Sequence, residues 1–275
     1  MFELTPDDAR EVFQAVERQS GTDLSGFALA SFRLRLLNLL HNYSLDSVQA
    51  LIARLKEEPA FFEIFMRDIS VGSPDMFRDP DFWIHLREEI LPALLKARLH
   101  PEVVLPESVT GNELYSLIVL LRESGEESRV EIAATCRNKA ILDQIRSGRF
   151  STGRYKNSTE NYKFFNPGSS LDAYFETRHG KMNFKADLLD GVKFRVQFPS
   201  RQAFHRQTAM VLYRNRMLYM NREAQEKRLK EILGGMPEGC LFVTGTGEEI
   251  RGLGYDRLLS VVSADLKIYA RTGEN

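Results

Sequence analysis

Apolar residues recur every three or four positions through the first seventy residues, which is the pattern of amphipathic helices. The pattern predicts four helices, starting near residues 6, 26, 46 and 59. The predicted caps are residues 5–8 (TPDD) for the first helix and 44–46 (SLD) for the third. Because the sequence GSP interrupts the pattern at 72–74, we expect a helical domain over residues 1–72.

From residue 80 onward, short apolar runs alternate with longer helical stretches. Strands are predicted at 103–105, 130–135, 192–198, 209–213, 241–244, 259–263 and 266–270, and helices at 81–97, 111–121, 139–147 and 221–233. Strands separated by helices form a mostly parallel sheet, so we expect an α/β, doubly wound domain over residues 73–275. The last two strands are expected to be antiparallel, and roughly 150–191 is predicted to be a long irregular stretch with a small antiparallel insertion.

The composition fits a globular protein, since 43% of the 275 residues are hydrophobic and 27% are charged. No stretch approaches the roughly 18 uncharged apolar residues of a membrane span, and the first residues lack the features of a signal peptide. We therefore expect a cytoplasmic protein without membrane insertion. A net charge of −1 gives no general attraction to nucleic acid, so no nucleic-acid partner is expected.

The charges are unevenly distributed along the chain. Residues 1–72 hold seven Lys and Arg against eleven Asp and Glu, a net −4, which leaves +3 for the remainder. Residues 149–206 hold eleven basic and five acidic residues, a net +6, interleaved with aromatic residues. This segment is either a binding surface for an anionic ligand or an acidic protein partner, or a solvated face around the antiparallel insertion, and we favour the solvated face.

Few residues have the spacing of a catalytic or metal site. Cys136 and Cys240 fit no metal or redox motif, and we interpret both as core thiols. None of the five histidines has a serine or an acid at a recognisable catalytic spacing. No metal site is predicted.

Five segments, in order and at matching intervals, resemble the CheR family of chemotaxis receptor methyltransferases. They are 76–83 (MFRDPDFW), 110–117 (TGNELYSL), 132–136 (IAATC), 213–221 (YRNRMLYMN) and 239–248 (GCLFVTGTGE). The resemblance implies a methyltransferase-like α/β sheet after a helical domain, S-adenosylmethionine as the cofactor, and glutamate side chains of a signalling protein as the substrate.

The resemblance also implies roles for four residues. Gly111 and Glu113 correspond to remnants of the cofactor pocket, and Arg78 and Tyr219 correspond to the arginine and tyrosine of the acceptor side. For three of them we favour a structural interpretation: an ion pair for Arg78, a favourable charge at a helix start for Glu113, and a core or rim position for Tyr219.

Several positions depart from the family in ways that would disable cofactor binding. The family ends its first strand in a turn of small residues, whereas this chain has Pro106 and Glu107, which remove a backbone donor and add a carboxylate. Cys136 stands where such folds use an acid that accepts both ribose hydroxyls, and Phe198 replaces an asparagine after the third strand. Losing about four such contacts would cost on the order of 4–10 kcal/mol, against the roughly 8 kcal/mol of a micromolar affinity.

The predicted second helix departs from the family as well. The resemblance implies docking onto acidic receptors through a basic second helix. Residues 31–40 (SFRLRLLNLL) of this chain instead keep only two arginines in an apolar run. Docking on an acidic receptor is therefore less expected, and we favour burial of this apolar face within the chain.

We therefore interpret the chain as a degenerate CheR-like protein, a pseudoenzyme that acts as an interaction or regulatory component of a signalling system. The alternative is an active S-adenosylmethionine-dependent protein-glutamate O-methyltransferase with a rearranged pocket, in which Asn112, Ser108 or Arg137 supplies the missing donors. A third possibility is a protein whose basic segment 149–206 binds an acidic partner.

Overall fold

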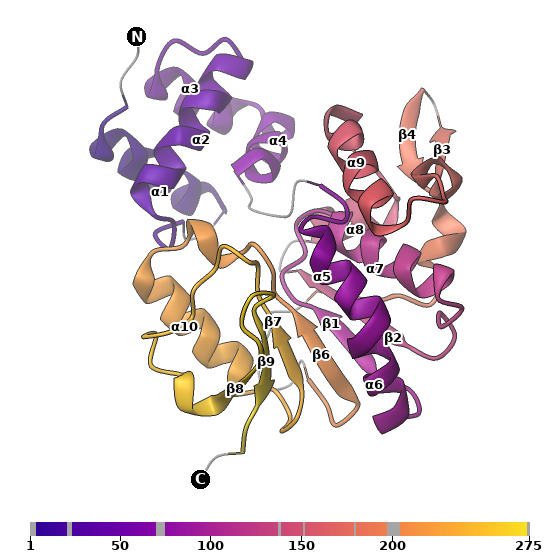
Figure 1. Ribbon diagram of the computed structural model, residues 1–275. Helices are drawn as coiled ribbons and strands as arrows, with labels where there is room; N and C mark the ends of the chain where they lie inside the picture. Colours follow the sequence, from indigo (N-terminus) through magenta and orange to yellow (C-terminus); the bar gives the residue numbers. More distant parts are fainter. Residues whose placement is uncertain are drawn as a thin grey trace. The chain divides into compact units, whose positions relative to one another are not determined.

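The chain divides into two compact units in the computed structural model, which describes residues 4–20, 24–69, 75–136, 139–150, 152–178, 180–196 and 204–273 (Figure 1). Residues 1–71 and 217–228 form the first unit, and residues 72–216 and 229–275 form the second. The first unit therefore consists of two separate parts of the sequence.

Four helices build most of the first unit, as the apolar pattern predicts. They are α1 (Pro6–Ser20), α2 (Leu29–Asn42), α3 (Val48–Glu57) and α4 (Pro59–Ile69). Their apolar faces meet in one core, in which Phe32, Leu36 and Phe65 are fully buried. Most of the apolar side chains of α2 are thus buried within this unit, although Leu34 is 62% exposed.

The two capping predictions in this unit have different outcomes. The Thr5 hydroxyl accepts a hydrogen bond from the Asp8 amide at 3.2 Å, and the Asp8 carboxylate accepts one from the Thr5 amide at 2.7 Å, which confirms the cap of α1. The predicted cap of α3 at 44–46 is wrong, because the Ser47 hydroxyl accepts the hydrogen bond from the helix, at 3.1 Å. Ser44 instead adopts a left-handed φ of 52° in the turn that ends α2.

The segment 217–228 completes the first unit by pairing with the loop that leads into α2. Phe27 forms an isolated antiparallel bridge with Met220, and the Ala28 amide donates to the Tyr219 carbonyl at 2.8 Å. These bonds hold the backbone before α2 in an extended form, so the helix starts later than its apolar pattern predicts.

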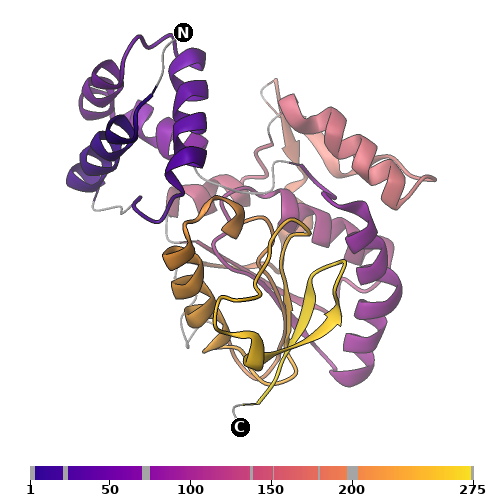
Figure 2. The same cartoon turned by 60° about the vertical axis from the view of Figure 1, so that its left-hand side comes forward.

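The second unit contains a seven-stranded sheet in the order β5-β2-β1-β6-β7-β9-β8. Its strands are β1 (Glu102–Leu105), β2 (Glu131–Cys136), β5 (Lys193–Val196), β6 (Thr208–Leu212), β7 (Leu241–Val243), β8 (Leu259–Ser263) and β9 (Ile268–Arg271). The strands β1, β2, β5, β6 and β7 pair in parallel. The strand β9 is antiparallel to both β7 and β8, and β8 and β9 are the yellow strands of Figure 2. The predicted α/β class with a mostly parallel sheet is confirmed.

The helices between the strands lie close to their predicted positions. They are α7 (Asn112–Glu123), α8 (Lys139–Arg146) and α10 (Arg222–Leu233). The helix predicted at 81–97 consists of α5 (Pro80–His85), the π-helical turn η1 (Leu86–Ile90) and α6 (Leu91–Ala97). The Leu91 amide bonds to the Leu86 carbonyl, five residues earlier, next to Pro92, which has no amide hydrogen and cannot continue the regular ladder.

The stretch from 150 to 191 contains the predicted antiparallel pair and one helix that the sequence analysis missed. The pair is β3 (Phe175–Arg178) with β4 (Lys181–Phe184), and the helix is α9 (Tyr155–Phe165). The prediction that this stretch is irregular is wrong for α9. The helix has no apolar repeat that would reveal it, because its sequence is mostly polar. Several aromatic side chains of this insertion are buried together, including Tyr162, Phe165 and Phe184. A binding surface at 149–206 stays a prediction.

Candidate functional site

The order of the strands marks one edge of the sheet as the place for a ligand. From β1 the chain proceeds to β2 and β5 on one side, and then to β6 and β7 on the other side. Open α/β sheets bind ligands at the carboxyl ends of their strands where the strand order reverses in this way. The candidate site is therefore the switch point, which we define as the carboxyl-terminal ends of β1 and β6 with the segments that follow them.

The segment after β1 is tied to both neighbouring strands. Glu107 has a left-handed φ of 54°, and its carboxylate accepts a hydrogen bond from the Tyr213 hydroxyl at 2.7 Å. Tyr213 directly follows β6 and is fully buried. The Ser108 amide donates to the carbonyl of Thr135 in β2 at 2.7 Å. Glu107 is predicted from the sequence as a departure from the family, but its partner lies 106 positions away and is not predicted.

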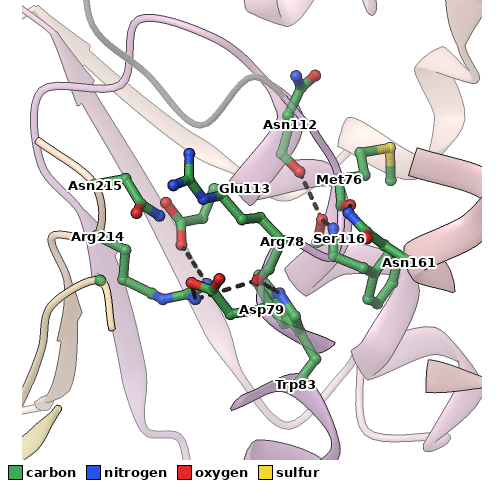
Figure 3. Close-up of polar contacts among 12 residues, drawn as sticks. Met76, Arg78, Asp79, Trp83, Asn112, Glu113, Ser116, Asn161, Arg214 and Asn215 are labelled. Carbon is green, nitrogen blue, oxygen red and sulfur yellow. Dashed lines mark hydrogen bonds and ion pairs between the residues drawn. The ribbon is translucent and has the colours of Figure 1, made fainter. Parts of the chain in front are cut away.

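A strained turn carries Arg78 into this region. Phe77 and Asp79, on either side of it, have left-handed φ values of 50° and 55°. The Phe77 amide donates to the Ser116 hydroxyl at 2.8 Å, and the Trp83 indole donates to the Arg78 carbonyl at 3.0 Å. Figure 3 shows Arg78, Trp83 and Ser116 around the turn. Because several bonds fix the turn, the strained conformation is maintained.

Arg214 is the centre of a buried ionic cluster. It is 1% exposed and donates to the Glu113 carboxylate at 3.1 Å and to the Asp79 carboxylate at 2.8 Å. Its guanidinium also lies 4.1 Å from the centroid of the Phe82 ring. Figure 3 shows Glu113 and Asp79 converging on this side chain. Burial raises the pKa of Glu113, and the Arg214 charge opposes that rise. Arg214 is not among the site residues predicted from the sequence, although basic residues inside the apolar run 211–219 (VLYRNRMLY) signal a buried ion pair.

The residue after Arg214 leaves one hydrogen-bond donor unused. Asn215 has a left-handed φ of 57°, and its amide donates to the Glu248 carboxylate at 2.9 Å. Gly245 is required here, because a Cβ on it would lie 2.5 Å from the Asn215 side-chain oxygen. The Asn215 side-chain nitrogen is buried and has no hydrogen-bond partner among the described residues. Such an orphan donor is uncommon and is consistent with a ligand site.

The predicted cofactor remnant Gly111 has a structural reason of its own to be glycine. A Cβ at this position would lie 2.1 Å from the Tyr115 ring. That ring is fixed, because its hydroxyl donates to the Ile145 carbonyl at 2.8 Å. Its face also stacks on the Phe184 ring, with the two ring centroids 4.4 Å apart. The packing explains the glycine, and a role for Gly111 in cofactor binding stays a prediction.

Cys136 is the last residue of β2 and is only 4% exposed. Its thiol is a weak hydrogen-bond acceptor and cannot bind two hydroxyls as a carboxylate does. Ser108, one of the predicted substitute donors, already donates its hydroxyl to the Leu105 carbonyl at 3.1 Å. Phe198 and Arg137 lie outside the described residues.

Tyr219 belongs to the first unit, whereas Arg78 belongs to the second. Tyr219 ends the short helix η5 (Met217–Tyr219), and the Arg35 guanidinium lies 4.4 Å from the centroid of its ring. This contact accounts for the aromatic side chain structurally. A role of Tyr219 on the acceptor side stays a prediction.

Other kinds of site find little support in the described part of the chain. No group of three or more His, Cys, Asp and Glu residues there is arranged to hold a metal ion. None of the described helices is both long enough and apolar enough to cross a membrane. Both cysteines are buried, as predicted, and burial raises the pKa of Cys240 to about 12, which makes it a poor nucleophile.

Comparison with known proteins identifies the family. Residues 73–267 match the family described as CheR methyltransferase, SAM binding domain. The Pseudomonas putida protein Cher3, whose name describes a methyltransferase, is 28% identical over 246 residues, which cover 90% of each chain. The chemotaxis protein methyltransferases of Listeria innocua and Listeria monocytogenes are each 20% identical over 241 residues, which cover 86% of this chain and 88% of theirs. Because the family match extends over more than half of the sequence, the chain belongs to the CheR methyltransferase family.

Proposed function

We propose that this protein is a degenerate CheR-family member that does not methylate a receptor and acts as an interaction or regulatory component of a signalling system. The observation that carries the proposal is the buried thiol of Cys136 at the carboxyl end of β2. A nucleoside cofactor at this edge needs an acid that accepts both ribose hydroxyls, and a thiol does not replace it.

The other charges at the switch point support the same proposal, because they already bind one another. Glu113 pairs with Arg214, and Arg214 pairs in turn with Asp79. A ligand that used the Glu113 carboxylate would compete with a buried guanidinium, and disrupting a buried pair is costly. The residues of this site therefore fit S-adenosylmethionine poorly.

The family supports a protein partner in signalling. Two relatives are named as chemotaxis protein methyltransferases, a class that acts within signalling systems. We infer that this chain retains such a partner in the cytoplasm while the reaction is lost. The net charge of −4 on residues 1–72 argues against an acidic docking partner for that part of the chain.

Two observations favour a second function, an active protein-glutamate O-methyltransferase with a rearranged pocket. The buried Asn215 side-chain nitrogen has no hydrogen-bond partner in the described part of the chain, and Arg78 stands on a strained turn. Strain and unsatisfied donors concentrate at ligand sites. This function requires a cofactor pocket that compensates for Cys136.

Isothermal titration of the full-length protein with S-adenosylmethionine and S-adenosylhomocysteine tests the proposal. We expect no saturable binding at low micromolar concentration. Saturable binding in that range would overturn the proposed loss of function. Transfer of a labelled methyl group to a receptor cytoplasmic fragment, abolished by Arg78→Ala, would then support the second function.

A further inference from the structure

A side-chain hydrogen bond links the two segments that follow β1 and β6 at the switch point. Glu107 follows β1 and Tyr213 follows β6, and these strands are parallel neighbours with Val104 opposite Val211. The 2.7 Å bond between the Tyr213 hydroxyl and the Glu107 carboxylate therefore crosses the place where the strand order reverses. Doubly wound folds bring a ligand to this place.

The backbone of Glu107 is held in a left-handed conformation that glycine adopts more easily than glutamate does. Its φ of 54° lies in the left-handed region, which strains a side chain with a Cβ and which glycine adopts freely. The strain is maintained because Ser108, the next residue, is tied to β2 through the Thr135 carbonyl and to β1 through the Leu105 carbonyl. A glycine would relieve this strain and also remove the carboxylate.

Tyr213 gives the bond a rigid partner. Its side chain is fully buried, and its amide donates to the carbonyl of Val243 at 2.9 Å. The phenol therefore has little freedom to turn away, and it fixes the Glu107 carboxylate at the end of β1. A carboxylate fixed there occupies the position at which a cofactor must come close to the backbone.

We propose that Glu107 and Tyr213 form a latch that closes the switch point and excludes an adenosine cofactor. The latch rests on the proposed function, because it supplies a further physical reason, besides the Cys136 thiol, for weak cofactor binding. It makes Glu107 a specificity-determining residue of the site.

The test measures binding of S-adenosylhomocysteine to the full-length protein by isothermal titration. We expect Glu107→Gly to bind about ten- to a hundredfold more tightly than the unaltered protein, since it removes the carboxylate and leaves a backbone that glycine tolerates. Tyr213→Phe removes only the hydroxyl and is expected to give a smaller gain. Thermal unfolding shows whether each variant folds.

Ser44→Gly is the matched control. Ser44 has a left-handed φ of 52°, like Glu107, but belongs to the first unit, in the turn that ends α2. This substitution relieves the same kind of backbone strain elsewhere and is expected to leave binding unchanged. An equal gain in Ser44→Gly would overturn the latch.

The outcomes separate the latch from the proposed function. Tight binding by the unaltered protein overturns the proposed function, whatever the variants do. A folded Glu107→Gly that binds no better than the unaltered protein overturns the latch alone. If Glu107→Gly does not fold, Tyr213→Phe decides, and a gain supports the latch whereas no gain overturns it.

Discussion

Left-handed backbone in residues other than glycine concentrates around the switch point. Phe77 and Asp79 flank Arg78, Glu107 follows β1, and Asn215 follows β6. Each such conformation costs on the order of 1–3 kcal/mol and persists only where the surroundings fix it. The surrounding hydrogen bonds and buried ion pairs meet this requirement, so the site is rigid even if its reaction is lost.

Gly111→Ala tests whether packing alone requires the glycine before α7. The new Cβ would lie 2.1 Å from a Tyr115 ring that cannot move aside, so we expect a loss of about 1–3 kcal/mol in the free energy of unfolding. Urea denaturation measures it. Gly153→Ala is the matched control, because a Cβ there meets nothing within 4 Å. Equal stability of the two variants would contradict the packing explanation.

The sequence anticipated individual residues of the site better than their partners. Glu113 and Glu107 were identified because each position has a counterpart in a local motif. Their partners, Arg214 and Tyr213, lie 101 and 106 positions away, and no local pattern connects residues across that distance. The contacts arise from the parallel pairing of β1 with β6, which only the folded sheet produces.

One carboxylate of α7 binds several side chains of the insertion after α8. Glu123, at the end of α7, accepts hydrogen bonds from the hydroxyls of Tyr162 and Tyr174 and, at 2.9 Å, from the side-chain nitrogen of Asn166. Three donors from one insertion converge on a single side chain. This carboxylate therefore couples the position of the insertion to the sheet domain.

Alkaline unfolding tests this attachment. Burial, with the Glu123 hydrogen bond, raises the pKa of Tyr174 to about 12 from its ordinary value of 10.0. Between these values the unfolded chain releases the phenol proton while the folded chain retains it. The contribution of Tyr174 to the free energy of unfolding is therefore fully present below pH 10 and is lost as the pH rises through 12. We expect the stability difference between the unaltered protein and Tyr174→Phe to shrink over this range. Urea denaturation at each pH measures this stability difference, and a difference that stays constant would argue against the attachment through Tyr174.

At the level of elements, the apolar pattern predicted those that bury a continuous face and failed for the others. The strands β1 and β2 were predicted because each contains a short apolar run, at 103–105 and 132–134. The helix α9 was missed because most of its side chains are polar and only Ser158, Tyr162 and Phe165 are buried. The π-helical turn before Pro92 was missed because the apolar repeat runs through it without a break.

The largest departure from a simple linear domain order is the composition of the first unit. Its helices come from residues 1–71, but it is completed by residues 217–228. Asn221 is central to this arrangement, because its side-chain oxygen accepts the Ala224 amide at 2.9 Å and its side-chain nitrogen donates to the Ser25 carbonyl at 2.8 Å. One residue thus caps α10 and holds the loop before α2.

Two substitutions at Asn221 separate these roles. Asn221→Asp keeps an oxygen for the cap and loses the donor to Ser25, whereas Asn221→Ala loses both. We expect Asn221→Ala to cost about 1–2 kcal/mol, and Asn221→Asp to cost less while still increasing hydrogen exchange of the amides at 27 and 28. Unchanged exchange in both variants would show that the segment does not hold the loop.

The discontinuous first unit also constrains the order of events during synthesis. Residues 1–71 leave the ribosome well before residues 217–228 are made, a delay on the order of ten seconds at typical rates of translation. During that time the loop before α2 lacks the strand partner that Met220 provides. The helical unit therefore reaches its final form only after most of the sheet has been synthesised, and a chain stopped early would expose an incomplete bundle to the cell's quality control.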